Sequence, residues 1–205
     1  MTTRQRSTSR KGDQRREEAL RAATSLFEEQ GYEQTSIQEL AAATGLLKGS
    51  LYYYFTSKED VLHHVLVRHH ERLYDFVVLR QDYGDLDGLD AVRVFVERHV
   101  TFVLRHPNLS ALYVQEQRPL TESDEWRRSL NALRRRHEEA LLAILDDAVA
   151  AGQASTDDAI LTVRGILSMA NATHRWYLSS PRRSKSAIAR HHGALAARVV
   201  AVTGP

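Results

Sequence analysis

Residues 35–60 of the chain are TSIQELAAATGLLKGSLYYYFTSKED, and their spacing predicts two short helices joined by a tight turn. Ser36 followed by Glu39 is a capping box, in which the hydroxyl and the carboxylate each accept a hydrogen bond from an amide at the helix start. Gly45 can adopt the left-handed backbone that ends a helix and turns the chain. The second helix is expected over about 47–55. Such a helix-turn-helix places its second helix in the major groove of DNA.

Three consecutive tyrosines, Tyr52, Tyr53 and Tyr54, occupy this second helix. Neighbouring helical residues lie about 100° apart around the axis, so at least one of the three rings must face outward. Leu51 and Phe55, four positions apart, are expected to hold the helix to the core. A tyrosine ring can pack on a sugar or a thymine methyl while its hydroxyl bonds a phosphate oxygen. We therefore expect DNA contact; the alternative is that these rings pack against neighbouring helices.

The helix-turn-helix lies within a longer pattern that covers about the first 65 residues. Its members are Arg16, Leu20, Ala22, Ala23, Leu26, Phe27, Gly31, Tyr32, Thr35, Ser36, Ala41, Gly45, the run KGSLYYYF at 48–55 and the run SKE at 57–59. This pattern resembles the TetR family of bacterial transcriptional regulators. The remaining two thirds of the chain are similar to that family only in length and helical character.

The resemblance implies a homodimer that binds a palindromic operator and leaves it when a small molecule enters the C-terminal domain. The residues that it places in the major groove are Lys48, Gly49, Ser50, Tyr52 and Tyr53. The residues that it places on phosphates are Thr35, Ser36, Tyr54 and Lys58. The sequence departs from the family pattern at Leu47, where a hydroxyl residue commonly caps the recognition helix. Leucine is a poor cap, so this helix start is expected to lack a side-chain hydrogen bond.

Composition predicts an all-α protein of about nine helices, because Ala, Leu, Arg and Glu are abundant while only four prolines interrupt 205 residues. The expected organisation is a disordered basic arm over 1–12, a three-helix helix-turn-helix DNA-binding domain over 13–60, and a ligand-binding and dimerisation domain over 61–205. A connecting helix is expected over about 58–80. A long helix over about 123–151 has a charge-rich middle, residues 127–139, that is expected to be solvated.

Several classes of function are disfavoured. The chain has no cysteine and no long apolar run, so we expect a cytoplasmic protein without disulfides, thiolate metal sites or contact with a membrane. Histidine pairs such as His63-His64 and His69-His70 show no acidic partner at metal-ligand spacing, so no metal site or other cofactor is predicted. Nucleophile elbows, phosphate-binding glycine loops and HExxH motifs are missing from the sequence, which disfavours an enzyme.

Basic residues gather at the N-terminus although the net charge is only +2. Residues 1–16 contain Arg4, Arg6, Arg10, Lys11, Arg15 and Arg16 against a single Asp13. The segment could lie along phosphates or enter the minor groove of DNA. It could equally be a solubilising tail without a specific contact.

Two apolar seams suggest how the subunits pair. The last helix, about 185–202, carries Ile188, His192, Leu195, Val199 and Val202 at steps of three and four. The penultimate helix, expected to run to about residue 179, carries Ile160, Val163, Leu167, Ala170 and His174. Two such helices from each subunit would form an intermolecular four-helix bundle. The alternative is that both seams are buried inside one subunit.

A polar stripe on the penultimate helix is the candidate ligand site. Arg164, Ser168, Asn171 and Arg175 follow one another at steps of four, three and four, so they share one helix face. An arginine fork matches a carboxylate or a phosphate, which suggests an anionic ligand; a solvent-facing strip is the alternative. Aromatic candidates for the pocket wall, each of which could simply be core, are Phe95, Phe102, Tyr113, Trp126 and Trp176.

The run ANATHRWY at 170–177 is similar to members of the same family that respond to acyl-CoA thioesters of lipid or steroid catabolism. The predicted function is therefore a ligand-responsive repressor whose effector is a small hydrophobic molecule, in one version an acyl-CoA. The alternatives are a DNA-binding protein without an effector, or a helical enzyme or carrier.

Overall fold

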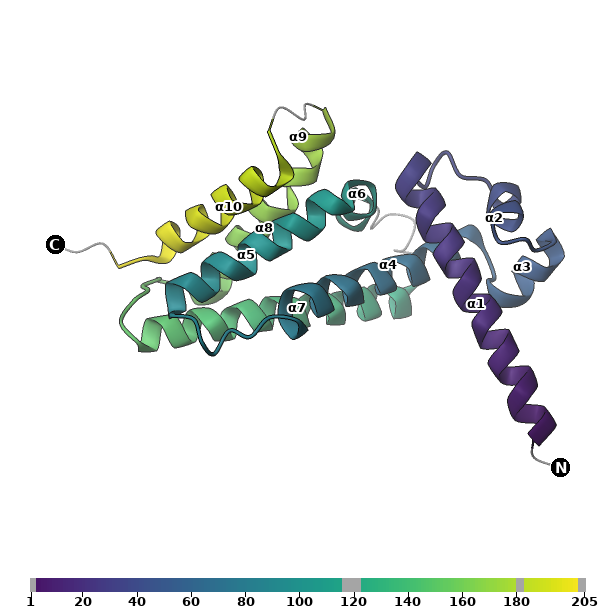
Figure 1. Cartoon of the computed structure of the whole chain (residues 1–205), viewed down its shortest axis with the longest axis horizontal. Coiled ribbons are helices and arrows are strands. Elements are labelled where there is room, and N and C mark those ends of the chain that lie inside the picture. The colour runs from purple at the N-terminus through teal and green to yellow at the C-terminus, as the bar shows by residue number, and fades with distance from the viewer. Residues whose placement is uncertain (1–2, 116–122, 180–182, 203–205) are drawn as a thin grey trace.

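The computed structural model describes residues 3–115, 123–179 and 183–202; the side chains of residues 3–11, 48, 114 and 115 lie outside this description. The helices are α1 (Thr3–Gln30), α2 (Ile37–Ala43), α3 (Lys48–Tyr54), α4 (Lys58–Tyr74), the π-helix η1 (Asp75–Leu79), α5 (Gly88–Arg105), α6 (Pro107–Gln115), α7 (Asp124–Ala150), α8 (Ala159–Asn171), α9 (Thr173–Ser179) and α10 (Lys185–Val200). The described residues form no strand beyond one isolated bridge between Ala154 and Ala201. The all-α class is thus confirmed. Figure 1 shows α1–α3 gathered at one end of an elongated molecule, joined to the remaining helices through α4.

Helix α1 is longer than the sequence predicts. The expectation was a disordered arm over 1–12 and a helix start near Asp13, whereas the structure continues the helix back to Thr3. No proline interrupts 3–12, and its Arg, Gln and Lys residues are good helix formers, so the helix can continue in spite of Gly12 and the run of Ser and Thr at 7–9. This N-terminal part projects beyond the body of the molecule (Figure 1).

A small core holds α1, α2 and α3 together as the DNA-binding unit. Phe27 from α1, Leu40 from α2, and Leu51 and Phe55 at α3 are all buried in one cluster. The predicted anchoring of the second helix by Leu51 and Phe55 is therefore confirmed. The turn before α3 is made by Gly45, whose φ of 65° is a left-handed backbone that favours glycine.

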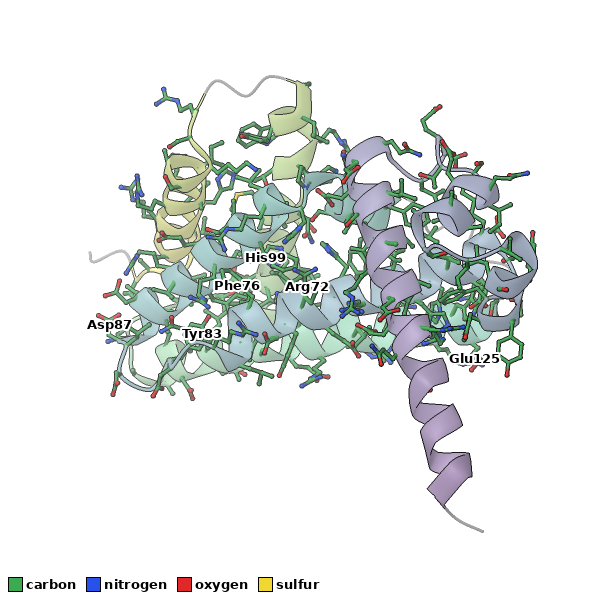
Figure 2. All side chains as sticks on the ribbon, turned by 45° about the vertical axis from the view of Figure 1, so that its right-hand side comes forward. Arg72, Phe76, Tyr83, Asp87, His99 and Glu125 are labelled. Carbon is green, nitrogen blue, oxygen red and sulfur yellow. The ribbon has the colours of Figure 1, made fainter. Side chains whose placement is uncertain are left out.

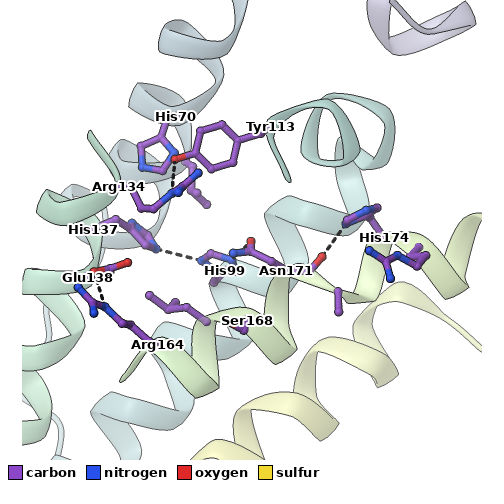
Figure 3. A pocket seen from close by; sticks show the side chains of 14 residues that line it. His70, His99, Tyr113, Arg134, His137, Glu138, Arg164, Ser168, Asn171 and His174 are labelled. Atoms are coloured by element: carbon purple, nitrogen blue, oxygen red, sulfur yellow. Dashed lines mark hydrogen bonds and ion pairs between the residues drawn. The ribbon is translucent and has the colours of Figure 1, made fainter. Parts of the chain in front are cut away.

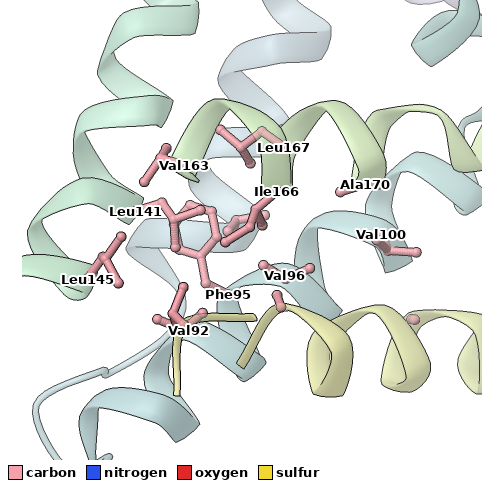
Figure 4. Close-up of a cluster of buried hydrophobic side chains, with 14 of the residues drawn as sticks. Val92, Phe95, Val96, Val100, Leu141, Leu145, Val163, Ile166, Leu167 and Ala170 are labelled. Carbon is pink, nitrogen blue, oxygen red and sulfur yellow. The ribbon is translucent and has the colours of Figure 1, made fainter. Parts of the chain in front are cut away.

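A larger core lies among α5, α7, α8 and α10. Figure 4 shows Phe95 of α5 directed between Leu141 of α7 and Ile166 of α8. Helix α10 lies against α5 so closely that a Cβ at Gly193 would come within 2.6 Å of the Arg93 carbonyl oxygen. Only glycine allows this approach without displacing backbone.

This core corrects the predicted dimer seams. In α8 and α9, Val163, Leu167, Ala170 and His174 are buried within the same subunit, and only Ile160 of that seam is exposed. In α10, Ile188 is also buried, while Val199 and the following Val202 are exposed. An apolar repeat of three and four fits any buried helix face, so the pattern alone could not distinguish a subunit core from a dimer interface.

The predicted penultimate helix is also divided. Its backbone breaks at Ala172 into α8 and the short α9, and the hydroxyl of Thr173 donates a 2.7 Å hydrogen bond to the Ala170 carbonyl at that corner. The side chains of Asn171 and Arg175 therefore come from different helices.

The DNA-binding unit is joined to the C-terminal helices at two places. Helix α4 continues from α3 after a three-residue link, and its Arg68 pairs with Glu17 of α1. At the start of α6, the Asn108 side chain donates a 2.6 Å hydrogen bond to the Glu28 carbonyl of α1. The Leu109 amide donates a 3.1 Å bond to the Glu28 carboxylate. Both α4 and α6 are thereby fixed to α1.

Side chains fill the body between α4, α5 and α7, where His99 is buried and Phe76 is partly buried (Figure 2). No helix within the described ranges has both the length and the apolar character that a membrane crossing requires.

Candidate DNA-reading helix and ligand cavity

Helix α3 presents a row of exposed side chains. The Tyr53 side chain is the most accessible of the large apolar groups, with an exposed fraction of 84%, and Tyr52 is 46% exposed. Gly49 and Ser50 are exposed at the beginning of the same helix. The prediction that tyrosine rings must face outward is confirmed, and four of the five residues expected in the major groove lie on accessible surface. For the fifth, Lys48, the side chain lies outside the described residues.

Tyr54 and Lys58 are arranged differently. The Tyr54 ring is half-buried, and its centroid lies 5.2 Å from that of Tyr53 in an edge-on contact. Lys58 lies at the first position of α4 with its Nζ 4.0 Å from the centre of the Tyr32 ring. Tyr54 therefore supports the Tyr53 ring from the side, and Lys58 is placed by a cation–π contact.

The two predicted phosphate contacts before α2 have different outcomes. Ser36 is exposed, and its capping box is present: its amide donates to Glu39 over 2.7 Å and its hydroxyl accepts from the Glu39 amide over 3.2 Å. Thr35, in contrast, is only 1% exposed. Its hydroxyl donates to the Gly31 carbonyl over 2.7 Å and its amide donates to Tyr32. The structure thus contradicts the predicted phosphate contact of Thr35, because both of its donors are used inside the protein.

The start of α3 lacks a side-chain cap, as the sequence predicts. Leu47 occupies the N-cap position, makes no capping hydrogen bond and is 81% exposed. A capping residue would satisfy one of the helix's first amides. Amides at this helix start therefore stay available to water or to a phosphate.

A cavity of about 420 Å³ lies between α4, α5, α6, α7, α8 and α9. It contains all four members of the predicted polar stripe, Arg164, Ser168, Asn171 and Arg175, together with Tyr113 of α6. Figure 3 shows these side chains converging from different helices. The structure thus brings together five of the nine residues proposed for ligand binding.

The other four aromatic candidates lie elsewhere. Phe95 and Phe102 are buried in the C-terminal core. Trp126 stacks on His63 with ring centroids 5.1 Å apart, next to the DNA-binding unit. Trp176 is exposed and stacks on His192 of α10. None of the four lines the cavity. The spacing of an aromatic residue along a helix predicts the face on which it lies, but not whether that face packs in a core or lines a cavity.

Four histidines line the cavity that sequence reasoning did not place there: His70 of α4, His99 of α5, His137 of α7 and His174 of α9. All four are buried, and His137 lies in the segment 127–139 that was expected to be solvated. The His99 and His137 rings are joined by a 2.9 Å hydrogen bond, and the other His99 nitrogen is 2.9 Å from Asn171 Oδ1. These residues come from separate helices, so their spacing in the sequence gives no signal.

Burial keeps these imidazoles neutral. Desolvation lowers the pKa of His70 to about 4 and that of His99 to about 4. Desolvation also lowers the pKa of His137 well below its usual range, and neighbouring histidines add to the effect. At neutral pH the interior of the cavity is therefore polar but uncharged.

Charge is concentrated at the cavity's accessible side. Arg164 and Arg175 are exposed, and Arg164 Nε lies 3.4 Å from the Glu138 carboxylate. Arg134 donates from its Nε to the Tyr113 hydroxyl over 3.3 Å. Among the described residues that line the cavity, Arg164 and Arg175 are the exposed guanidinium groups, and the planar fork of arginine suits an anionic group.

One group outside the cavity has the composition of a metal site. Asp60, His63 and His64 each offer a ligand atom within 4.8 Å of the others, so the sequence prediction that these histidines lack an acidic partner is wrong. However, the Asp60 carboxylate accepts 2.8 Å and 3.1 Å hydrogen bonds from Thr56. Arg16 Nη2 lies 2.8 Å from His64 Nε2, and a guanidinium there opposes a cation. The group is better explained as the junction of α1 with the start of α4.

An accessible recognition helix, attached to a helical domain that contains a polar cavity, defines a DNA-binding transcriptional regulator. Residues 19–65 match the family of bacterial regulatory proteins of the tetR type, and residues 85–200 match the tetracyclin repressor-like C-terminal domain. The HTH-type transcriptional repressor KstR2 of Rhodococcus jostii (strain RHA1) is 30% identical over 170 residues, which are 80% of this chain and 79% of that protein. The chain belongs to the TetR family of bacterial transcriptional regulators.

Solved structures agree with this assignment. PfmR, a TetR family transcriptional regulator from Thermus thermophilus, is 34% identical with a TM-score of 0.73, covering 88% of this chain and 97% of that one. AibR, solved in complex with isovaleryl coenzyme A and operator DNA, has a TM-score of 0.74 and also covers 88% of this chain and 97% of that one. At 22% sequence identity, this similarity concerns the fold alone. KstR2 and PfmR are both transcriptional regulators.

Proposed function

We propose that this protein is a repressor that binds a palindromic operator as a homodimer through α3 and is released when an acyl-CoA thioester occupies the cavity. The observation that carries the proposal is that one chain has both an accessible aromatic recognition helix and a cavity with arginines at its accessible side. A DNA-binding protein without an effector would not need such a cavity.

The DNA contact is supported by the accessible row on α3. Tyr53 and Tyr52 offer rings and hydroxyls to sugars, thymine methyls and phosphates, and Gly49 lets the helix backbone approach a base closely. Two copies of α3 must reach successive major grooves about 34–36 Å apart, which requires a dimer.

The dimer is supported by a revised apolar surface. Ile160 and Leu161 of α8 are exposed, as are Val199 and Val202 at the end of α10. Leu161 and Val199 line the same surface groove, together with the polar residues Ser155, Thr156, Asp157, Asp158 and Thr162, so the exposed ends of α8 and α10 lie near each other. Apolar side chains gathered in this way on a surface mark an interaction site.

The effector class is supported by the charges and size of the cavity. Its 420 Å³ falls within the usual range for small-molecule sites, about 300–1,000 Å³, and would hold an acyl group but not a whole coenzyme A. The phosphates would then lie over Arg164 and Arg175 at the accessible side. Isovaleryl coenzyme A in AibR, a protein of the same fold, is consistent with this class.

Release of DNA is explained by the position of α4. His70 and Leu73 of α4 line the cavity, while the first turn of the same helix packs on the DNA-binding unit. An occupant that displaces α4 would therefore also move the DNA-binding unit. The distance between α3 and the α3 of the other subunit would then change. A few ångströms of change in their spacing would lose one half-site.

The test is selection of operator sequences from random DNA, followed by titration of the complex with acyl-CoA esters of increasing chain length. We expect at least one ester to release the DNA. Arg164→Gln should raise the ester concentration needed about tenfold or more, since a hydrogen bond to a charged group contributes about 1.5–3 kcal/mol. Arg190→Gln, an exposed position on α10 outside the cavity, is the matched control. Intact operator binding with no release by any ester would refute the effector class.

A further inference from the structure

We propose that the N-terminal part of α1, residues 3–15, is a second DNA-contacting element, which lies along the phosphate backbone beside the groove that receives α3. We call this segment the basic arm. The inference rests on the proposed function in taking α3 as the DNA-reading helix. It chooses between the two roles, phosphate contact and solubilising tail, that the sequence leaves open for the N-terminal residues.

The basic arm begins beside the recognition helix. At its base, the Arg16 guanidinium lies 5.2 Å from the centre of the ring of Phe55, the C-cap residue of α3. Arg16 Nη2 also lies 2.8 Å from His64 Nε2 of α4. These contacts hold the base of the arm at the C-terminal end of α3. Because the major groove is about 12 Å wide, a helix that enters it has phosphates close by, and so has the start of the arm.

The arm is long enough to pass several phosphates. Helix α1 starts at Thr3, and at a rise of about 1.5 Å per residue the part before Arg16 extends about 20 Å. Figure 1 shows this part projecting beyond the other helices, from the end of the molecule where α2 and α3 lie. Successive phosphates of one strand are about 3.4 Å apart along the duplex axis, so about six base pairs fall within its reach.

The charge of the arm suits a polyanion. Residues 3–15 contain Arg4, Arg6, Arg10, Lys11 and Arg15 against Asp13 alone, a net charge of +4 in a chain whose total is +2. Residues 6 and 10, like residues 11 and 15, are four positions apart, where like charges on a helix repel each other. Phosphates would offset this repulsion and release their counterions on contact.

The first experiment measures operator affinity over a range of salt concentrations with two variants of the full-length protein. The arm variant combines Arg4→Gln, Arg6→Gln, Arg10→Gln and Lys11→Gln, since glutamine is also a good helix former. The control variant removes the same number of charges from exposed positions outside the arm, by Arg135→Gln, Arg183→Gln, Lys185→Gln and Arg190→Gln.

Each phosphate contact contributes about 0.9 to the slope of log affinity against log salt concentration. One contact in each arm of a dimer therefore predicts that the arm variant has a slope shallower by about 2, with binding weakened about tenfold or more at 0.1 M salt. The control variant should keep the wild-type slope. An unchanged slope in the arm variant, or the same reduction in both variants, would overturn the inference.

The second experiment locates the contact by hydroxyl-radical footprinting on the selected operator. In each half-site, wild-type protein should protect backbone positions within about six base pairs of those covered by α3. The arm variant should lose that protection and keep the protection due to α3. Identical footprints for the wild type and the arm variant would count against the arm as a DNA contact.

Folding should be the same in both variants. Residues 13–15 are exposed, and the first buried side chains of α1 within the described residues are Ala19 and Leu20. A lower melting temperature for the arm variant alone would show that the arm packs on the protein, which also contradicts the inference. A protein that selects no operator refutes the proposed function and the arm together, whereas a selected operator with unchanged slope and footprint refutes only the arm.

Discussion

The DNA-binding unit and the C-terminal domain depart from the ordinary distribution of side chains in opposite directions. The first exposes large aromatic and apolar groups, with Tyr53 and Leu47 almost fully accessible. The second buries polar groups, with His70 and His137 enclosed and incompletely hydrogen-bonded within the described structure. Each arrangement is unfavourable in the isolated chain.

The difference shows how the two surfaces should respond to perturbation. Exposed aromatic groups can be removed with little effect on folding, because they contribute few internal contacts. Buried neutral histidines contribute to the free energy of unfolding in two ways. Their side chains pack in the interior, and their protonation favours the unfolded chain. Truncation of the exposed tyrosines of α3 should therefore alter mainly DNA affinity, and changes in the cavity should alter stability as well.

A fall in pH should produce the largest change in stability, because it acts on the buried histidines of the C-terminal domain. The unfolded chain takes up protons on histidine below about pH 6.5, whereas folding holds His70 and His99 neutral down to about pH 4. The free energy of unfolding should thus fall as the pH is lowered from 6.5 to 4, by about 3 kcal/mol per histidine at the end of that window. Urea denaturation at several pH values measures this. His191→Gln, at an exposed position, should keep the same slope; a flat profile between pH 7 and pH 5 would contradict the burial of these rings.

Tyr53→Ala should weaken operator binding by about 1–3 kcal/mol, because we propose that its exposed ring and hydroxyl contact the DNA. The melting temperature should hardly change, since the side chain is exposed. Leu79→Ala, a similar truncation of an exposed side chain at the end of η1, is the control and should leave affinity unchanged. Fluorescence anisotropy with labelled operator at physiological salt is the measurement. Unaltered affinity would remove Tyr53 from the interface.

Ser36→Ala should destabilise the DNA-binding unit by about 1 kcal/mol, because it removes the acceptor for the Glu39 amide at the start of α2. Thermal unfolding followed by circular dichroism measures the loss. Ser50→Ala, which also truncates an exposed serine, should have a smaller effect on stability. If Ser50→Ala lowered the stability as much as Ser36→Ala, the capping box would make no stabilising contribution of its own.

Leu47→Ser should have the smallest effect and the opposite sign. A hydroxyl at the N-cap of α3 would accept from an amide that now lacks a side-chain partner, adding several tenths to about 1 kcal/mol of stability. Hydrogen exchange of the α3 amides measures the gain directly. No added protection would mean that leucine is as well tolerated there as a hydroxyl residue.

The DNA-binding unit could be predicted from sequence because its determinants are local. The capping box at Ser36, the left-handed Gly45 and the pair Leu51 and Phe55 all act within one or two helical turns. The burial of Thr35 was missed, because its hydroxyl is used by the Gly31 carbonyl four residues earlier.

The cavity could be predicted only in part, because it is built by long-range contacts. The steps of four and three in α8 correctly grouped Arg164, Ser168 and Asn171 on one face. No local pattern could show that His70, His99 and His137 meet, since they lie on three helices. The aromatic residues Phe95 and Phe102 were assigned to the wall because a ring in a core and a ring in a cavity have the same spacing along a helix.

The attachment of Glu28 to the start of α6 has a mechanical consequence. The DNA-binding unit is held both by the covalent continuation into α4 and by the Asn108 and Leu109 bonds from α6. The stacked rings of His70 and Tyr113 connect those same two supports at the cavity wall. If an occupant separated His70 from Tyr113, the distance between these two supports would change, and we expect α3 to rotate and not merely to shift along its axis.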